Sequence, residues 1–266
     1  MTDEKPKDIA EYKKWLKEKH KIEISDKTQK YYDSVTNIIK LDLEKSEFWI
    51  QLTKNLREYD GEYYAQTGYN LLSQGFELVL HKKSFESFLL KTFRKNIIDN
   101  ECWPNEPKDR WILPNNWYSR INDIIRTLFE VKYLDGVEFI ISIIKSICEK
   151  HSMEFKVSYE ATEVGYYASH LYIRKKFEIP KVTWDTEWID VSIEIQITTQ
   201  IQEVIRKLLH KYYEDARKRL EKEDIKWQWN YESDEFAANY LGHILHYVEG
   251  MIMEIRKKQE QKEEII

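Results

Sequence analysis

The chain has 266 residues, of which 42% are apolar and 33% are charged, and its formal net charge is −5. This composition is sufficient for one or two domains with a buried core, and the small net charge gives no bulk electrostatic reason to expect a nucleic-acid partner. The two cysteines are too few for a disulfide framework or a tetrahedral metal site. No apolar run approaches membrane-spanning length and no signal region is evident, so we predict a cytoplasmic protein without a membrane segment.

The first hundred residues are predicted to be nearly all helical. Ser25, Ser46 and Ser84 each precede a run of apolar residues at helical spacing, which is typical of a helix N-cap. A marginal, partly exposed helix is expected within residues 1–24 and another over residues 63–72. The abundant aromatic side chains of this region are most simply explained as core.

Residues 100–116 hold three of the five prolines and interrupt the helical pattern. We therefore divide the chain into a helical N-terminal region, residues 1–107, packed on a core formed by residues 108–266. A helix is predicted directly after the interruption, over residues 117–129.

Alternating apolar and polar residues predict strands over residues 155–159, 167–173 and 184–197. In the last strand, isoleucine and valine residues occupy one face. The other face carries Asp190, Ser192, Glu194, Gln196 and Thr198. A carboxylate held on a rigid strand, such as that of Glu194, is suited to bind a metal ion or to act as a general base.

Helical spacing returns after residue 200. A last helix is predicted to begin at Ser233 or Asp234, with an apolar face made of Phe236, Tyr240, Ile244, Tyr247, Met251 and Ile255. These elements predict an α+β fold: a mixed β-sheet flanked by helices, with a helical N-terminal region and a long C-terminal helix.

Three short motifs occur in a fixed order in the second half of the chain. They are GYYASH over residues 165–170, EIQITT over residues 194–199, and a histidine, His210, eleven residues later. In order and spacing they resemble the synthetase domain of the RelA/SpoT family. The resemblance implies a nucleotidyltransferase-like fold and an ATP-dependent pyrophosphokinase, with Mg²⁺ as cofactor. Such an enzyme transfers pyrophosphate to the 3′-hydroxyl of a guanosine nucleotide in alarmone synthesis for the stringent response.

The resemblance also assigns roles to single residues. Tyr166 matches the aromatic residue that stacks on the acceptor base. Glu194 matches the carboxylate that binds Mg²⁺ and takes a proton, with His170 and Gln196 beside it as further catalytic candidates. Asp135, close to the place of the family's metal-binding aspartate, is the second candidate metal ligand. The candidate nucleotide-binding residues are Tyr166, Arg110, Arg120, Lys132, Arg206 and His210.

Five positions depart from the family motifs. Ile112 stands where the family has lysine, Tyr133 where it has aspartate, and Glu138, Tyr167 and Thr198 where it has arginine. Two functions therefore stay open. One is a divergent pyrophosphokinase that acts on a guanosine nucleotide or a related acceptor such as tRNA. The other is a catalytically degenerate domain that binds a nucleotide or a protein. A homo-oligomer or an antitoxin-like protein partner is compatible with either.

Each candidate also has a purely structural interpretation. Glu194 would be an exposed carboxylate on an edge strand, and Asp135 a turn residue before Gly136. Tyr166 would be one core or surface aromatic among 18 tyrosines, and His170 and His210 would be hydrogen-bonded structural histidines.

Overall fold

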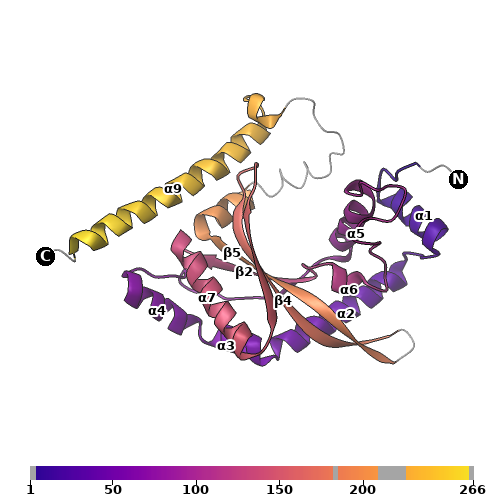
Figure 1. Ribbon diagram of the computed structural model, residues 1–266, viewed down its shortest axis with the longest axis horizontal. Helices are drawn as coiled ribbons and strands as arrows, with labels where there is room; N and C mark the ends of the chain where they lie inside the picture. Colours follow the sequence, from indigo (N-terminus) through magenta and orange to yellow (C-terminus); the bar gives the residue numbers. More distant parts are fainter. Residues whose placement is uncertain (1–3, 182–184, 209–225, 264–266) are drawn as a thin grey trace. The chain divides into compact units, whose positions relative to one another are not determined.

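The computed structural model describes residues 4–181, 185–208 and 226–263 (Figure 1). Its contacts define two compact units. The first unit comprises Met1–Trp49, Leu80–Thr127 and Tyr172–Glu194, and the second comprises Ile50–Val79, Leu128–Leu171 and Ile195–Ile266. The sequence-based division between residues 1–107 and 108–266 remains a prediction about the domains.

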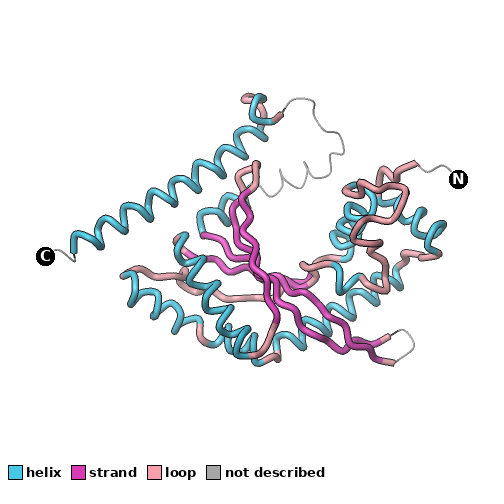
Figure 2. Tube along the Cα trace, in the orientation of Figure 1, coloured by secondary structure: helices cyan, strands magenta, loops and turns pink. Residues whose placement is uncertain are grey.

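A five-stranded sheet forms the centre of the α+β fold (Figure 2). Its strands are β1 (His81–Lys82), β2 (Ile125–Val131), β3 (Glu154–Ala161), β4 (Tyr167–Pro180) and β5 (Thr186–Thr199), in the order β1-β2-β5-β4-β3. Strand β1 pairs with β2 in antiparallel orientation. The three predicted strands are confirmed as β3, β4 and β5, and the predicted α+β class is confirmed with them.

Strand β5 is central, with a hydrogen-bonded neighbour on each side. Its side chains are consecutively buried from Val191 to Ile195 and again from Ile197 to Thr199, although alternate side chains point to opposite faces of the sheet. The polar positions are therefore covered as well as the apolar ones, and Glu194 is only 8% exposed. The alternative of an exposed carboxylate on an edge strand is wrong for Glu194.

The helical character of the first hundred residues is confirmed. It comprises α1 (Ile9–His20), α2 (Asp26–Glu44), α3 (Glu47–Lys54), α4 (Leu56–Thr67) and α5 (Phe85–Phe93), the last continued by a π-helical turn, η1 (Arg94–Ile98). All three predicted serine caps accept a hydrogen bond from the first turn of the helix that follows: Ser25 caps α2, Ser46 caps α3 and Ser84 caps α5. The helix expected over residues 63–72 is displaced, because Gly68 adopts a φ of +74° and ends α4.

Helix α1 is more deeply buried than its charged sequence predicts. Tyr12 and Leu16 are fully buried against Leu89, Phe93 and Ile97. These two apolar residues are enough to bury one side of α1, because α5 and η1 present an apolar face to it within the same unit.

The helix predicted over residues 117–129 is wrong. Helix α6 covers only Trp117–Arg120, and strand β2 begins at Ile125. Helical and strand spacing are hard to distinguish in a short apolar run, and here the β-branched and aromatic residues follow the strand alternation. Helix α7 follows β2; it begins at Leu134 and continues to Lys150.

The C-terminal part contains a short 3-10 helix, η2 (Trp227–Trp229), and the long helix α9 (Asp234–Glu263). The hydroxyl of Ser233 accepts the backbone N–H of Phe236, which confirms the predicted start of α9. Among the described residues, no helix combines the length and the apolar character needed to cross a membrane.

The backbone of helix α9 lies close to the backbone of the segment before β4, at Gly242 and Gly165. A Cβ atom on Gly242 would overlap the backbone of Gly165, and Gly165 itself has a φ of +73°. We expect Gly242→Ala to lower the free energy of unfolding by about 2 kcal/mol, because backbone cannot move aside as a flexible side chain can. Gly250→Ala, on the same helix with no atom within 4 Å, is the matched control and should stabilise by about 0.5–1 kcal/mol. Urea unfolding of both variants measures the difference, and equal effects would contradict the close approach.

Candidate active site

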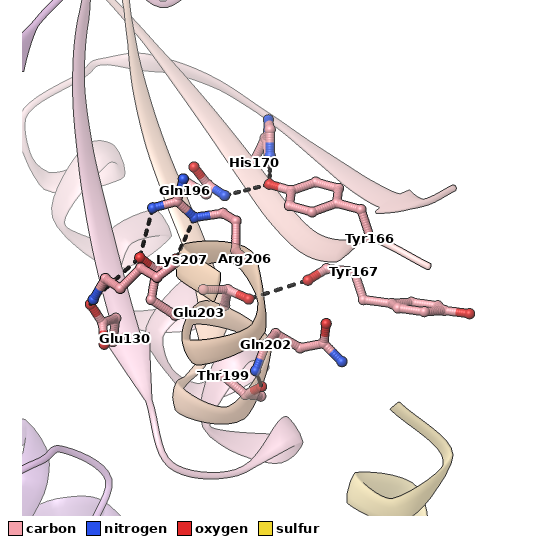
Figure 3. Close-up of polar contacts among 11 residues, drawn as sticks. Glu130, Tyr166, Tyr167, His170, Gln196, Thr199, Gln202, Glu203, Arg206 and Lys207 are labelled. Carbon is pink, nitrogen blue, oxygen red and sulfur yellow. Dashed lines mark hydrogen bonds and ion pairs between the residues drawn. The ribbon is translucent and has the colours of Figure 1, made fainter. Parts of the chain in front are cut away.

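Three predicted site residues meet where β4 begins and β5 approaches its end (Figure 3). The hydroxyl of Tyr166 lies 3.1 Å from Nε2 of His170, and it accepts a short hydrogen bond from Nε2 of Gln196. The two rings meet edge to face, with centroids 6.2 Å apart. These contacts fix the half-buried Tyr166 ring from two strands and hold it in one orientation, as a base-stacking platform requires.

The helix over residues 200–208 places a charge cluster beside this tyrosine (Figure 3). Arg206 donates two hydrogen bonds, of 2.6 and 2.7 Å, to the two carboxylate oxygens of Glu203, which is 1% exposed. Lys207 lies 3.4 Å from both Glu203 and Glu130. The hydrogen bonds that Arg206 donates to the Glu203 carboxylate raise the pKa of Arg206. Two cations and two carboxylates balance here, so the cluster offers an oriented guanidinium without net positive charge.

Tyr167, the first residue of β4, points away from Tyr166 (Figure 3) and contacts helix α9. Its hydroxyl lies 2.8 Å from Nδ1 of His243, and its ring stacks on His246 at a centroid distance of 3.7 Å. Burial and the neighbouring His243 lower the pKa of His246. The two histidines of α9 therefore hold a tyrosine in place. Among the described residues, no group of three potential ligands lies close enough to hold a metal ion.

A buried carboxylate lies one turn further along α9. Glu249 is 4% exposed and accepts a 3.2 Å hydrogen bond from Nε2 of Gln202. Burial raises the pKa of Glu249 above its ordinary value of 4.5, while hydrogen bonds from Thr199 and Gln202 oppose the shift. The folded chain therefore keeps a proton that the unfolded chain has lost, and stability falls as the pH rises from 4.5 through the folded-state pKa.

Glu249→Gln should remove this pH dependence, because an amide does not titrate. We expect the stability advantage of the variant over the wild-type chain to grow as the pH is raised from about 4 to about 8. Comparing the two proteins at each pH by urea unfolding cancels the titration of groups remote from residue 249. His246 is not one of them, since its Nδ1 atom lies 3.9 Å from Oε2 of Glu249. A constant difference across this range would contradict the assignment.

The guanidinium of Arg256 on α9 is sandwiched between two tyrosine rings. It lies 4.2 Å from the ring centroid of Tyr69 and 4.5 Å from that of Tyr133, and the residue is 4% exposed. Its NH1 group also lies 3.2 Å from the hydroxyl of Tyr63 and 3.3 Å from Oδ1 of Asp135. Asp135 accepts a further 2.7 Å hydrogen bond from Tyr63. This aspartate, in the first turn of α7, thus contacts a buried cation.

Solved structures share this fold. No protein-family model and no curated protein sequence matches the chain. Small alarmone synthetase 1 from Bacillus subtilis matches with a TM-score of 0.52 at 13% identity, covering 89% of this chain and 97% of that one. A GTP pyrophosphokinase family protein from Streptococcus pneumoniae matches with a TM-score of 0.52 at 14% identity, covering 91% and 97%. The Bacillus synthetase bound to its product pppGpp matches with a TM-score of 0.51 at 14% identity, covering 88% and 97%.

The chain has the fold of a small alarmone synthetase. The resemblance to the RelA/SpoT synthetase domain is thereby confirmed at the level of the fold. At these identities the match concerns the backbone alone, and the roles of single residues stay predictions.

Within this small alarmone synthetase fold, Glu194 is buried on β5 two residues before Gln196. The two side chains follow the same alternation of the strand. Glu194 ends the first unit's share of β5, and Gln196 belongs to the second unit. The carboxylate lies on a central strand and is 8% exposed, and its catalytic and metal-binding roles remain predictions.

The remaining predicted nucleotide-binding residues are divided between the two units. Arg110 and Arg120 belong to the first unit, where Arg110 is exposed and the Arg120 guanidinium donates to the carbonyl of Asp109. Lys132 belongs to the second unit, and its backbone N–H donates to the carbonyl of Leu71. His210 lies outside the described residues.

Each of the five departures from the family motifs has a partner within its own unit. Ile112 is 4% exposed, and its backbone N–H donates to Oδ1 of the buried Asn96. The other four pairs are Tyr133 with Arg256, Glu138 with Tyr159, Tyr167 with His243 and His246, and Thr198 with the carbonyl of Tyr167. The residues at these five positions are thus accommodated within their own units.

The sequence did not identify Glu203, Glu249 or Arg256 as parts of these clusters. For Glu203 a signal was present, because it lies three residues before Arg206 and such residues are neighbours on a helix. Arg256 carries no local signal of this kind, since its partner Asp135 is 121 positions away.

Proposed function

We propose that this chain is an ATP-dependent pyrophosphokinase that forms a (p)ppGpp-type alarmone from a guanosine nucleotide. The observation that carries the proposal is the direct hydrogen bonding of Tyr166 to His170 and Gln196. These residues come from the two motifs that resemble the RelA/SpoT synthetase domain, and Glu194 precedes Gln196 on the same strand. The fold shared with the small alarmone synthetases supports the same conclusion.

The proposed reaction assigns one task to each group. The ring of Tyr166 stacks on the guanine base, held by His170 and Gln196. The carboxylate of Glu194 takes the proton from the 3′-hydroxyl as its oxygen attacks the β-phosphorus of ATP. The bond between the β-phosphorus and the oxygen bridging it to the α-phosphorus breaks, and AMP leaves. Arg206 offers its partly exposed guanidinium to phosphate oxygens.

Mg²⁺ is the cofactor implied by this reaction, and it would neutralise charge on the ATP phosphates. Mg²⁺ sites commonly use one or two carboxylates together with the phosphates of the substrate. The buried carboxylate of Glu194 fits such a site. Asp135 fits less well, because its Oδ1 atom lies 3.3 Å from the Arg256 guanidinium, which repels a divalent cation. As a metal ligand, Asp135 stays a prediction.

A transfer assay tests the proposal directly. The chain is incubated with ATP labelled in its γ-phosphate, Mg²⁺, and GDP, GTP, ATP or tRNA in separate reactions. We expect label to appear in GDP or GTP. A labelled product formed from ATP or tRNA as the acceptor, and from no guanosine nucleotide, would reject the guanosine nucleotide as acceptor. No labelled product with any acceptor would reject the pyrophosphokinase itself.

A second candidate function is a catalytically degenerate domain that binds a nucleotide. Two observations favour it. The residues that replace the motif residues make contacts within the fold, as Tyr133 does with Arg256. The charges around Arg206 are balanced, which leaves little net positive charge to bind a triphosphate. This candidate predicts that calorimetry detects ATP binding in the presence of Mg²⁺ while the transfer assay stays negative. Action in the cytoplasm and an antitoxin-like protein partner remain predictions under either function.

A further inference from the structure

The side chain of Arg206 lies beside the tyrosine to which we assign the acceptor base. An aromatic ring stacks on any nucleobase, so the rest of the nucleotide needs a hydrogen-bonding group of its own. Figure 3 shows Arg206 on the side of its helix that faces Gln196, and its guanidinium interacts electrostatically with Tyr166. The group that fixes the orientation of this guanidinium therefore affects how the acceptor binds.

Glu203 holds the Arg206 guanidinium along one edge. The two carboxylate oxygens of Glu203 accept hydrogen bonds from Nε and Nη2 of Arg206, and the glutamate side chain is 1% exposed. A carboxylate is costly to bury, and a bidentate pair with arginine offsets this cost while it fixes the plane of the guanidinium. The pair therefore defines one orientation for the head group of Arg206.

The opposite edge of the same guanidinium stays open. A guanidinium carries five N–H donors, and Glu203 takes one from Nε and one from Nη2. Among the described residues Arg206 makes no further hydrogen bond, and its side chain is 35% exposed. The donors that are left on Nη1 and Nη2 form a second fork, whose spacing matches two oxygens of a phosphate group.

We propose that Glu203 is a positioning residue, which holds Arg206 so that this second fork binds the phosphates of the acceptor nucleotide. The inference rests on the proposed function, since it needs a guanosine nucleotide whose base stacks on Tyr166. The ligand group is the 5′-diphosphate of a nucleotide such as GDP, because Arg206 lies beside the residue that holds the acceptor. Glu203 itself is covered by Arg206 and Lys207 and does not touch the nucleotide.

The charge of Glu203 separates a positioning role from a purely electrostatic one. A carboxylate near a phosphate site repels the phosphates, so its removal should strengthen binding if charge alone counts. If Glu203 positions Arg206, its removal leaves the guanidinium free to rotate, and binding becomes weaker. Glu130 is the matched control, because it lies 3.4 Å from Lys207, as Glu203 does, and accepts neither of the hydrogen bonds that Arg206 donates.

Calorimetric titration with GDP, in the absence of ATP, measures the effect. We expect Glu203→Gln to raise the Kd for GDP about tenfold, a loss of about 1.4 kcal/mol, although the substitution makes the site more positive. Glu130→Gln makes the same chemical change and should bind GDP at least as tightly as the wild-type chain. Guanosine, which lacks phosphates, should bind Glu203→Gln as tightly as the wild-type chain, because stacking on Tyr166 is unaffected.

A double-mutant cycle tests whether Glu203 acts through Arg206. We expect Arg206→Ala to weaken GDP binding about thirtyfold, and the addition of Glu203→Gln to have no further effect. Arg206→Lys keeps Glu203 and the positive charge but lacks the fork, so it should weaken GDP binding about tenfold. This variant keeps the inference testable if circular dichroism shows that Glu203→Gln is unfolded.

Four results would overturn the inference. Unchanged or tighter GDP binding by Glu203→Gln would leave Glu203 with an electrostatic role only. Independent effects of the two substitutions in the cycle would show that Glu203 does not act through Arg206. Equal losses for guanosine and GDP would indicate a structural role. Weaker binding of a non-hydrolysable ATP analogue, with GDP binding unchanged, would place the fork on the donor.

Failure of the proposed function gives a different result. A wild-type chain that does not bind GDP would reject both the proposed function and the positioning role of Glu203. GDP binding that follows the expected pattern, together with no transfer of label, would support the positioning role and reject the pyrophosphokinase alone.

Discussion

We expect Glu194→Gln to reduce pyrophosphate transfer by about a thousandfold while the fold stays intact, because a positioned general base contributes about 10²–10⁴-fold. The amide has nearly the same shape as the carboxylate, so it fits the buried position on β5. It can neither accept the proton of the 3′-hydroxyl nor supply the charge that holds Mg²⁺. The label-transfer rate at saturating ATP and acceptor, compared with the wild-type rate, measures the loss.

Asp190→Asn is the matched control for this experiment. It makes the same chemical change on the same strand and in the same alternation, at a position that is exposed. We expect its transfer rate to remain within a factor of about two of the wild-type rate, since exposed surface substitutions rarely matter. Thermal melts of both variants separate loss of function from loss of structure. A folded Glu194→Gln variant with wild-type activity would remove this residue from the mechanism.

Arg256→Ala should lower the free energy of unfolding by about 3 kcal/mol. The substitution removes a buried cation from between two aromatic rings and leaves a cavity there, and it also removes a partner of Asp135. Arg256→Lys should have an intermediate effect, because the ammonium group keeps the charge but lacks the flat surface that stacks on both tyrosines.

Urea unfolding measures these losses, with Lys257→Ala as the control. Lys257 is the next residue of α9 and is exposed, so its truncation should change stability by no more than about 0.5 kcal/mol. An Arg256→Ala variant as stable as the control would show that α9 is not held at this point, and it would remove the main structural argument against Asp135 as a metal ligand.

Much of the candidate site was predictable from sequence because its signals are local. Alternation predicted the strands β4 and β5. The resemblance to the RelA/SpoT motifs singled out Tyr166, just before β4, and Gln196 on β5 as candidate site residues. The side chains of Ser25 and Ser84 capped helices as expected, since a cap depends only on the next three residues.

Other features could not be predicted, because they depend on which surfaces meet. The segment over residues 117–129 contains an apolar run compatible with a helix or a strand, and pairing with neighbouring strands decided for β2. The burial of Glu194 follows from the central place of β5 in the sheet. The partner of Asp135 comes from a helix at the other end of the chain.

By itself, the sequence determined the helical character of the N-terminal region, the strands β3, β4 and β5, and the motifs that they carry, because these properties are set by neighbouring residues. Only the tertiary structure decided that α9 buries Asn239, Glu249 and Arg256 and presents its apolar face outward. The hydrophobic pattern of a helix marks two faces, but it does not say which face is covered by the same chain and which awaits another. That choice depends on shape and on polar partners distant in sequence, such as Tyr167 and Asp135.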